Sequence, residues 1–205
     1  MKFIREKFNK VFRPNRERLL RAIMEGSLAD VQNVLRKRPA LNFEEGLPLF
    51  LAVETNDAEK TRALIDAGAD PQRCSGGIVA IAAMRGDIEM LTMLLDAGAD
   101  PSSRSCSALY WSCKLGKSES VKLLFEHGAE ACVSTLRKAW QSGCPETIDL
   151  VLDHFKDMDM IEWEIGCHRD PNGKSSVHPH LLARYEQMKS NLRTRTAPKV
   201  IPATP

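Results

Sequence analysis

Cysteine and histidine side chains gather near residue 170, where Cys167 and His168 are followed by His178 and His180. Thiolate sulfur and imidazole nitrogen are ligands that Zn²⁺ prefers in proteins. However, an adjacent pair followed by two histidines at i and i+2 matches no standard structural zinc site. We therefore expect a hydrated turn without metal here. An enzyme or metalloprotein built on this turn is the alternative.

Other fragments resemble catalytic sequences, but each lacks a required part. His168–Asp170 resembles the H-R-D of the protein-kinase catalytic loop, yet Ser175 stands where that loop needs asparagine. Gly166 and Gly173 resemble a phosphate-binding loop, but six residues separate them instead of four, and no strand precedes them. Cys113 has no histidine in register to act as its base and is expected to be a small buried residue. The sequence predicts no enzyme, no catalytic residue, no metal and no cofactor.

The net charge of +2 combines basic ends with an acidic middle. Residues 1–18 contain seven Lys or Arg and two Glu, and residues 184–205 contain five Lys or Arg and one Glu. Such a distribution argues against the broad basic face that phosphate backbones require. We expect no nucleic-acid partner.

The composition is typical of a soluble protein, with 43% hydrophobic and 27% charged residues. No apolar stretch reaches the roughly 18 to 20 residues that span a bilayer, and charges interrupt any secretory signal at the start. The six cysteines form no CxxC pair and are expected to be reduced thiols. We expect a cytoplasmic monomer, acting in its own cell or, if it is a delivered effector, in a host cytosol.

An octapeptide recurs at a fixed interval: LIDAGADP at 64–71, LLDAGADP at 94–101 and, more loosely, LFEHGAEA at 124–131. Apolar and small positions repeat at the same 30-residue step; they are Leu19, Leu49, Val79 and Leu109, with Ala22, Ala52, Ala82 and Ser112. In the third unit the pattern predicts a helix over 78–84, a turn at 86–87 and a second helix over 88–97. Gly98 ends that helix, because glycine adopts positive φ at low cost. One such pair of helices cannot bury its apolar face, so the pairs must stack.

The segments VAIAAMRGDIEMLTMLLDAGADP (79–101) and LYWSCKLGKSESVKLLFEHGAE (109–130) resemble ankyrin repeats, which have a Leu-His-x-Ala-Ala-x-x-Gly core and a Leu-Leu-x-x-Gly-Ala-Asp close. The resemblance covers about residues 19–157. It implies an all-α ankyrin-repeat solenoid of helix-turn-helix pairs. The linkers here are about three residues shorter than in the family's usual unit, so we expect little β-hairpin.

The expected organisation has a solenoid between two capping segments. The ankyrin repeats occupy 19–160, as units 19–48, 49–78, 79–108, 109–135 and 136–160. Residues 1–18 form a basic amphipathic capping helix, residues 161–192 a C-terminal cap with a helix from about 180 to 192, and residues 193–205 a flexible basic tail. The first segment has two other interpretations, an organelle-targeting segment and a membrane-surface anchor with Phe3, Phe8, Phe12 and the flanking Lys and Arg at the lipid.

In the family, the first helix of each pair lines a concave groove. The resemblance places in this groove Leu51, Ile81, Met84, Arg85, Tyr110, Trp111, Lys114 and Leu115, between basic residues Arg21 and Lys138. An apolar centre with a tryptophan and a polar rim is typical of a protein-binding hot spot. Two other interpretations are that these residues are buried within the stack, or that the C-terminal helix (Leu181, Leu182, Tyr185 and Met188) covers them.

The resulting functional prediction is a non-enzymatic adaptor or inhibitor that binds another protein through the groove. The alternative is a membrane-associated scaffold anchored by the N-terminal helix.

Overall fold

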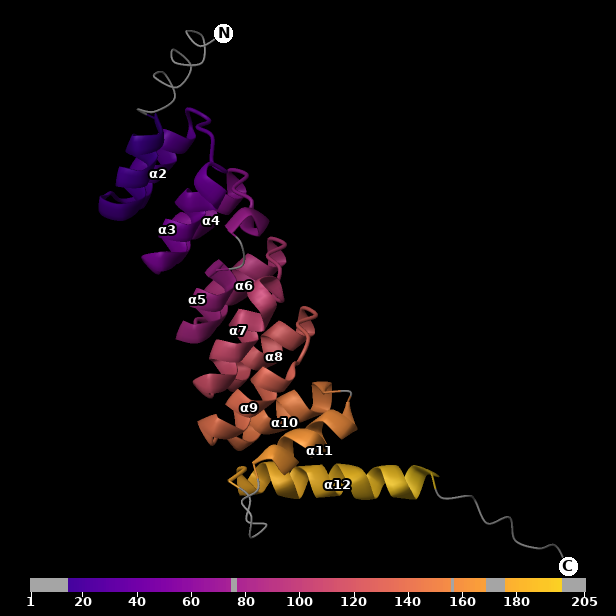
Figure 1. Ribbon diagram of the computed structural model, residues 1–205. Helices are drawn as coiled ribbons and strands as arrows, with labels where there is room; N and C mark the ends of the chain where they lie inside the picture. Colours follow the sequence, from indigo (N-terminus) through magenta and orange to yellow (C-terminus); the bar gives the residue numbers. More distant parts are fainter. Residues whose placement is uncertain (1–14, 75–76, 156, 169–175, 197–205) are drawn as a thin grey trace, which may run out of the picture.

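The computed structural model describes residues 15–74, 77–155, 157–168 and 176–196 (Figure 1). Within these residues the chain forms helices and turns and no β-strand. The predicted all-α solenoid with short linkers is therefore confirmed. Phe3, Phe8 and Phe12 lie outside the described residues, as does the predicted tail beyond residue 196. None of the described helices is both long and apolar enough to cross a bilayer.

Pairs of helices follow one another along a single row (Figure 1). A helix over residues 15–25 pairs with α2 (Leu28–Leu35), and the next pairs are α3 (Leu47–Glu54) with α4 (Ala58–Asp66), α5 (Gly77–Arg85) with α6 (Ile88–Asp96), α7 (Ser103–Lys114) with α8 (Ser118–Glu126), and α9 (Val133–Ser142) with α10 (Pro145–His154). Short 3-10 helices, η1 (Glu44–Gly46) and η2 (Pro71–Cys74), lie in two of the linkers. The chain ends its described part with α11 (Met158–Cys167) and α12 (Pro179–Thr196).

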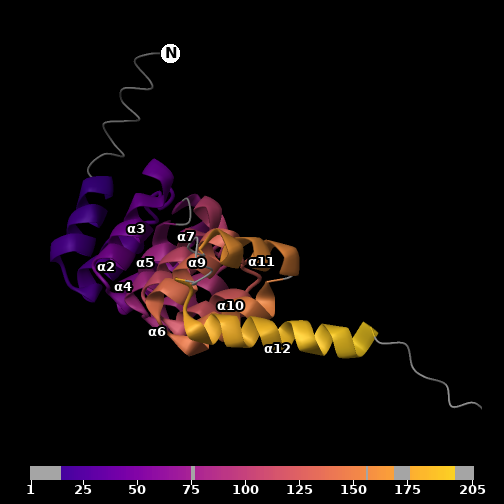
Figure 2. The same cartoon turned by 60° about the horizontal axis from the view of Figure 1, so that its bottom comes forward.

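The stack has two layers. The inner helices α3, α5, α7 and α9 contact one another in series, and so do the outer helices α2, α4, α6, α8 and α10. At the C-terminal end α11 packs on α9, while α12 packs on α10 and crosses the end of the row (Figures 1 and 2). α12 continues to Thr196, past the predicted end near residue 192, so the first residues of the predicted tail are helical.

Side-chain caps begin several outer helices at the repeat interval. Ser27 forms a capping box with Asp30 at the start of α2, and Asp57 and Asp87 accept the Lys60 and Met90 N–H groups at the starts of α4 and α6. These side chains bind N–H groups that have no carbonyl partner in the first helical turn. The recurring polar residue therefore fixes where α2, α4 and α6 begin.

The repeated octapeptide is a helix C-terminus. Gly98 has a φ of +89°, and the Ala99 and Gly98 N–H groups donate to the carbonyls of Leu94 and Leu95 at 3.0 and 2.9 Å. This pair of hydrogen bonds is the Schellman motif, which needs a residue with positive φ at this position. The predicted role of Gly98 in ending the helix is confirmed, and the other two copies end α4 and α8 with the same hydrogen bonds.

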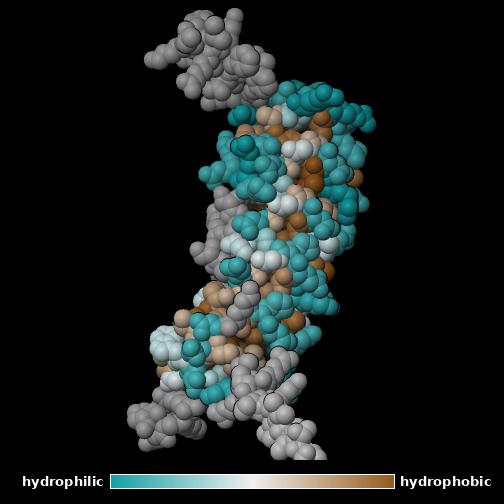
Figure 3. All heavy atoms as spheres, turned by 90° about the vertical axis from the view of Figure 1, so that its right-hand side faces the viewer, coloured by the Kyte–Doolittle hydropathy of each residue, from teal (hydrophilic) through white to brown (hydrophobic). Residues whose placement is uncertain are grey.

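A continuous hydrophobic core runs between the two layers. The positions that repeat at 30-residue steps are buried: Leu19, Leu49, Val79 and Leu109, with Ala22, Ala52, Ala82 and Ser112. Figure 3 faces the side on which α4, α6 and α8 lie and shows a hydrophobic seam along the stack between hydrophilic borders. Each pair buries its apolar face against its neighbours, so stability depends on adjacent contacts along the row.

Two cations join consecutive pairs at equivalent backbone carbonyls. Lys60 Nζ donates to the Ile23 carbonyl at 3.1 Å, and Arg85 Nη1 donates to the Val53 carbonyl at 2.7 Å. The two carbonyls lie near the C-termini of inner helices, where backbone acceptors lack helical partners and positive charge is favoured. Each contact therefore caps one inner helix with a side chain from the next pair.

Candidate functional site

The inner helices alternate between a buried face and a groove face. In α7, Leu109, Ser112 and Cys113 are buried, whereas Trp111 and Leu115 at its C-terminal end keep 37% and 47% of their surface exposed. Because these exposed positions follow one another at helical spacing, they form one strip along the inner surface. The same alternation in α5 leaves Met84 exposed.

Two aromatic rings and two lysines from neighbouring helices form the centre of this surface, which we call the aromatic–lysine cluster (Tyr110, Trp111, Lys114 and Lys138). The two rings meet edge to face with centroids 5.5 Å apart. Lys114 Nζ lies 4.5 Å from the Trp111 ring centre and Lys138 Nζ lies 5.6 Å from the Tyr110 ring centre. Ammonium groups over aromatic faces attract the rings, so the cluster is preorganised across α7 and α9.

Three of the predicted groove residues have packing roles in the structure. Leu51 and Ile81 are half-buried and pack against the core. Arg85 bonds the α3 carbonyls of Val53 and Glu54 at 2.7 and 2.9 Å and lies 4.0 Å from the Glu54 carboxylate. The interpretation as ordinary packing therefore fits Leu51 and Ile81, while Met84, Arg85, Trp111, Lys114 and Leu115 remain accessible.

The described part of the C-terminal helix does not cover the groove. Leu181 and Tyr185 of α12 are buried, but α12 packs on the outer helix α10 and crosses the end of the row (Figure 2). The interpretation in which this helix folds back over Trp111 is therefore wrong. The buried side chains of α12 pack against the end of the stack instead.

The repeated pairs of helices have counterparts in known proteins. The family model for ankyrin repeats (3 copies) matches residues 49–135 and 79–162, more than half of the chain. The chain belongs to the ankyrin-repeat family. The crystal structure of the human ASB11 ankyrin repeat domain is similar, with a TM-score of 0.61 and 24% sequence identity over 81% of each chain, which is a likeness of fold. No curated protein matches the chain significantly. Ankyrin repeats generally mediate protein–protein interaction.

The ankyrin stack uses the C-terminal histidines in packing and hydrogen bonds. His168 Nδ1 lies 3.0 Å from the Glu164 carbonyl and the ring meets Trp140 edge to face, while His180 Nε2 lies 3.0 Å from Asp149 Oδ1. Among the described residues no three His, Cys, Asp or Glu side chains are grouped as metal ligands. Asp170, Gly173 and Ser175 lie outside the described residues.

The thiol of Cys113 is fully buried in the core. Burial, with a smaller effect of Cys132, raises the pKa of the Cys113 thiol to about 12. A nucleophilic cysteine needs a thiolate near neutral pH, which polar or cationic surroundings favour. Cys113 is thus a small core residue of its repeat, and the equivalent residue Ala83 of the preceding unit is buried in the same way.

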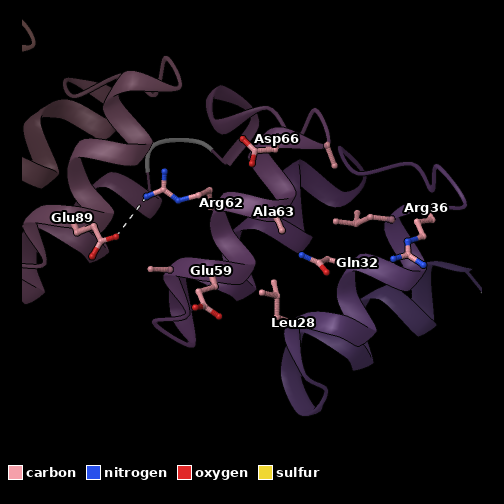
Figure 4. Close-up of a pocket in the computed structure, with 11 residues that line it drawn as sticks. Leu28, Gln32, Arg36, Glu59, Arg62, Ala63, Asp66 and Glu89 are labelled. Atoms are coloured by element: carbon pink, nitrogen blue, oxygen red, sulfur yellow. Dashed lines mark ion pairs between the residues drawn. The ribbon is translucent and has the colours of Figure 1, made fainter.

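A hollow of about 800 Å³ opens on the outer side of the ankyrin stack between α2 and α4 (Figure 4). Leu28 and Leu35 line it from α2 and Ala63 from α4, with Arg62 and Glu89 forming an ion pair of 3.6 Å at its rim. The larger residues Met93 and Leu123 occupy the position of Ala63 in the next two outer helices. The hollow is therefore explained by the small side chain of Ala63. Its rim carries both signs of charge, so it shows no preference for a charged ligand.

Sequence reasoning missed a buried ion pair at the C-terminal end. Arg137 occupies the histidine position of its ankyrin unit, and its Nε and Nη2 bond the two carboxylate oxygens of Glu164 at 2.6 and 3.0 Å. The Glu164 side chain is fully buried, and its hydrogen bonds raise the pKa of Arg137. The only signal in the sequence was an arginine at a repeat position that holds uncharged residues in the other units.

Proposed function

We propose that this ankyrin-repeat protein is a non-enzymatic adaptor or inhibitor that binds a segment of a partner protein across α5, α7 and α9. The observation that carries the proposal is the exposure of Met84, Trp111 and Leu115 on one strip of the inner surface. Large apolar side chains that remain exposed together on a soluble protein commonly mark a binding surface. Trp111 is the anchor, because tryptophan contributes strongly to protein interfaces.

Rigidity supports this proposal. Trp111 contacts Tyr110 and Lys114 on its own helix, and Tyr110 in turn contacts Lys138 of α9. A side chain held in one orientation before association loses less conformational entropy when a partner binds. The partner therefore meets a preformed surface rather than ordering one.

Site-specific photo-crosslinking tests the proposal in cell extract of the source organism or its host. A photoreactive amino acid at Leu115 is expected to give discrete adducts with another protein, and the same amino acid at Lys122 on the outer face of α8 is the matched control. Trp111→Ala should remove the Leu115 adducts without lowering the melting temperature by more than a few degrees, because the ring is partly exposed. Adducts that are equal at both positions, or that persist in Trp111→Ala, would contradict the proposal.

A further inference from the structure

The inner and outer layers differ in charge along the C-terminal half of the stack. α5, α7 and α9 contain no Asp or Glu, and their charged side chains that the structure describes are Arg85, Lys114, Arg137 and Lys138. The outer helices α6, α8 and α10 contain Glu89, Asp96, Glu119, Glu126, Glu146, Asp149 and Asp153 against Lys122 alone. The acidic middle of the sequence is therefore displayed on one side of the stack, and the inner side is basic.

The two lysines of the aromatic–lysine cluster have no carboxylate partner among the described residues. Lys114 contacts the Trp111 ring, and Lys138 contacts the Tyr110 ring and donates to Gln141 at 2.8 Å. Other lysines of the chain do have acidic partners, such as Lys189 with Glu162 at 3.0 Å. The cluster thus presents positive charge beside exposed apolar surface without neutralising it.

We propose that the inner surface binds an acidic amphipathic segment of a partner protein. An apolar side chain of that segment packs on Trp111 and Leu115, and its carboxylates pair with Lys114 and Lys138. The inference rests on the proposed function and adds the chemistry of the partner. Complementary charge at the rim selects among partners, and the apolar contact at the centre supplies most of the affinity.

A single-stranded nucleic acid is the other anionic ligand that aromatic and basic side chains accept. The surface fits it less well, because the aliphatic side chains of Met84 and Leu115 extend the strip where further stacking or phosphate contacts would be needed. The acidic outer helices also repel a long phosphate backbone. We therefore assign the surface to a peptide and use an oligonucleotide as a competing probe.

Peptide binding to the full-length protein tests the inference. The probes are labelled helical peptides that share one leucine face and carry Glu, Gln or Lys at every other position, together with oligothymidylate. Fluorescence anisotropy at low and high ionic strength gives each dissociation constant. We expect the Glu peptide to bind most tightly, the Lys peptide to bind weakest, and added salt to weaken only the Glu peptide, because exposed charges are screened.

Variants connect this preference to the residues. Lys114→Glu with Lys138→Glu should weaken the Glu peptide by roughly tenfold and strengthen the Lys peptide, since two exposed ion pairs become repulsive. Trp111→Ala should weaken the Glu peptide by roughly thirtyfold, as expected for an anchor residue. The matched controls are Lys122→Glu on α8 and Trp163→Ala on α11, where another tryptophan, outside the aromatic–lysine cluster, is 59% exposed. Both controls should bind as the unaltered protein does.

Each contrary result has a distinct meaning. Equal binding of the three peptides that still depends on Trp111 would overturn the charge preference and leave the groove in place. If the Glu peptide bound equally tightly to the Trp111→Ala variant, both the charge preference and the groove would be overturned. Tighter binding of oligothymidylate than of any peptide, or no binding of the Glu peptide, would overturn the assignment to an acidic segment.

Discussion

The first and last contacts between neighbouring elements of the described stack are built in different ways. At the N-terminal end α2 faces α4 across an open hollow lined by Leu28, Leu35 and Ala63 (Figure 4). At the C-terminal end α11 is fixed to α9 by the fully buried Glu164 and its partner Arg137. The difference teaches that a helix pair needs only a neighbour to pack against, and that this contact can leave an open hollow or can enclose a buried carboxylate with its ion-pair partner.

The C-terminal end also has exposed ion pairs. Asp149 of α10 accepts from His180 Nε2 at 3.0 Å and from Arg184 Nε at 3.3 Å, and all three side chains are partly exposed. The ion pairs of α12 therefore lie at the surface, whereas the ion pair of α11 has its carboxylate in the interior. The following substitutions separate these contributions from one another and from the N-terminal end.

The largest effect is expected for the buried pair. Arg137→Ala leaves the Glu164 carboxylate buried, and among the described side chains His168 is the remaining ion-pair partner, at 3.7 Å. Removing one partner of a buried pair is strongly destabilising, and because Arg137 itself is partly exposed we expect a loss of about 2 to 3 kcal/mol in the free energy of unfolding. Urea denaturation measures the loss, and hydrogen exchange should show that α11 opens before α5. Adding Glu164→Leu to the Arg137→Ala variant should recover part of the stability. A loss below about 0.5 kcal/mol for Arg137→Ala alone would contradict a stabilising role of the buried pair.

A glycine near the N-terminal end gives the next effect. Gly46 has a φ of +80°, and an added Cβ would lie 2.5 Å from Cys74 Sγ, whereas Gly68 has a φ of +95° with no atom within 4 Å of such a Cβ. Gly46→Ala combines backbone strain with a clash and should cost about 2 kcal/mol, against about 1 kcal/mol for strain alone in Gly68→Ala. Thermal denaturation of the two variants compares them. Equal losses would show that the contact with Cys74 is readily relieved.

A smaller effect is expected at the surface of the C-terminal end. Asp149→Ala removes the acceptor of both His180 and Arg184 and should cost about 0.5 to 1 kcal/mol, because exposed ion pairs are screened by solvent. The loss should shrink further in high salt, unlike that of Arg137→Ala. Denaturation midpoints with and without salt measure this, and a loss as large as that of Arg137→Ala would remove the distinction between buried and exposed pairs.

The smallest effect has the opposite sign and concerns the hollow. Ala63→Met places in α4 the residue type that α6 has at Met93, and the added side chain covers Leu28 and Leu35. Burial of this apolar area should raise the free energy of unfolding by about 0.5 kcal/mol. Denaturation in urea measures the gain, and Ala29→Met on exposed surface of α2 is the control. A loss of stability would show that the hollow cannot accept a longer side chain.

Periodicity made the stack predictable. Leu49, Val79 and Leu109 recur at the same interval as the contacts they make, so their burial follows from the repeat itself. The exposure of Trp111 and Leu115 follows from the same register, because they lie on the opposite side of a helix whose other side is buried. The central part of the candidate site could therefore be predicted from the sequence.

Contacts that break the repeat were not predictable in this way. Arg137 and Glu164 are 27 residues apart, and Glu164 lies outside the repeat register, so no pattern connects them. Arg85 was expected at the rim of the groove and is exposed, but its hydrogen bonds to two backbone carbonyls of α3 follow from no pattern in the sequence. Long side chains reach whichever acceptor the neighbouring pair supplies, and that depends on spacing in three dimensions.

The opposite charges of α5, α7 and α9 on one side and of α6, α8 and α10 on the other make this part of the stack an electric dipole directed from one layer to the other. A negatively charged chain that comes within a Debye length, about 10 Å at 0.1 M salt, exerts a torque on such a body. Rotational diffusion is then biased so that Lys114 and Lys138 face the incoming chain before any contact forms. For the acidic segment that we propose as the partner, this orientation should make encounters productive more often and set the association rate, while the lifetime of the complex should depend on how completely the partner covers Trp111.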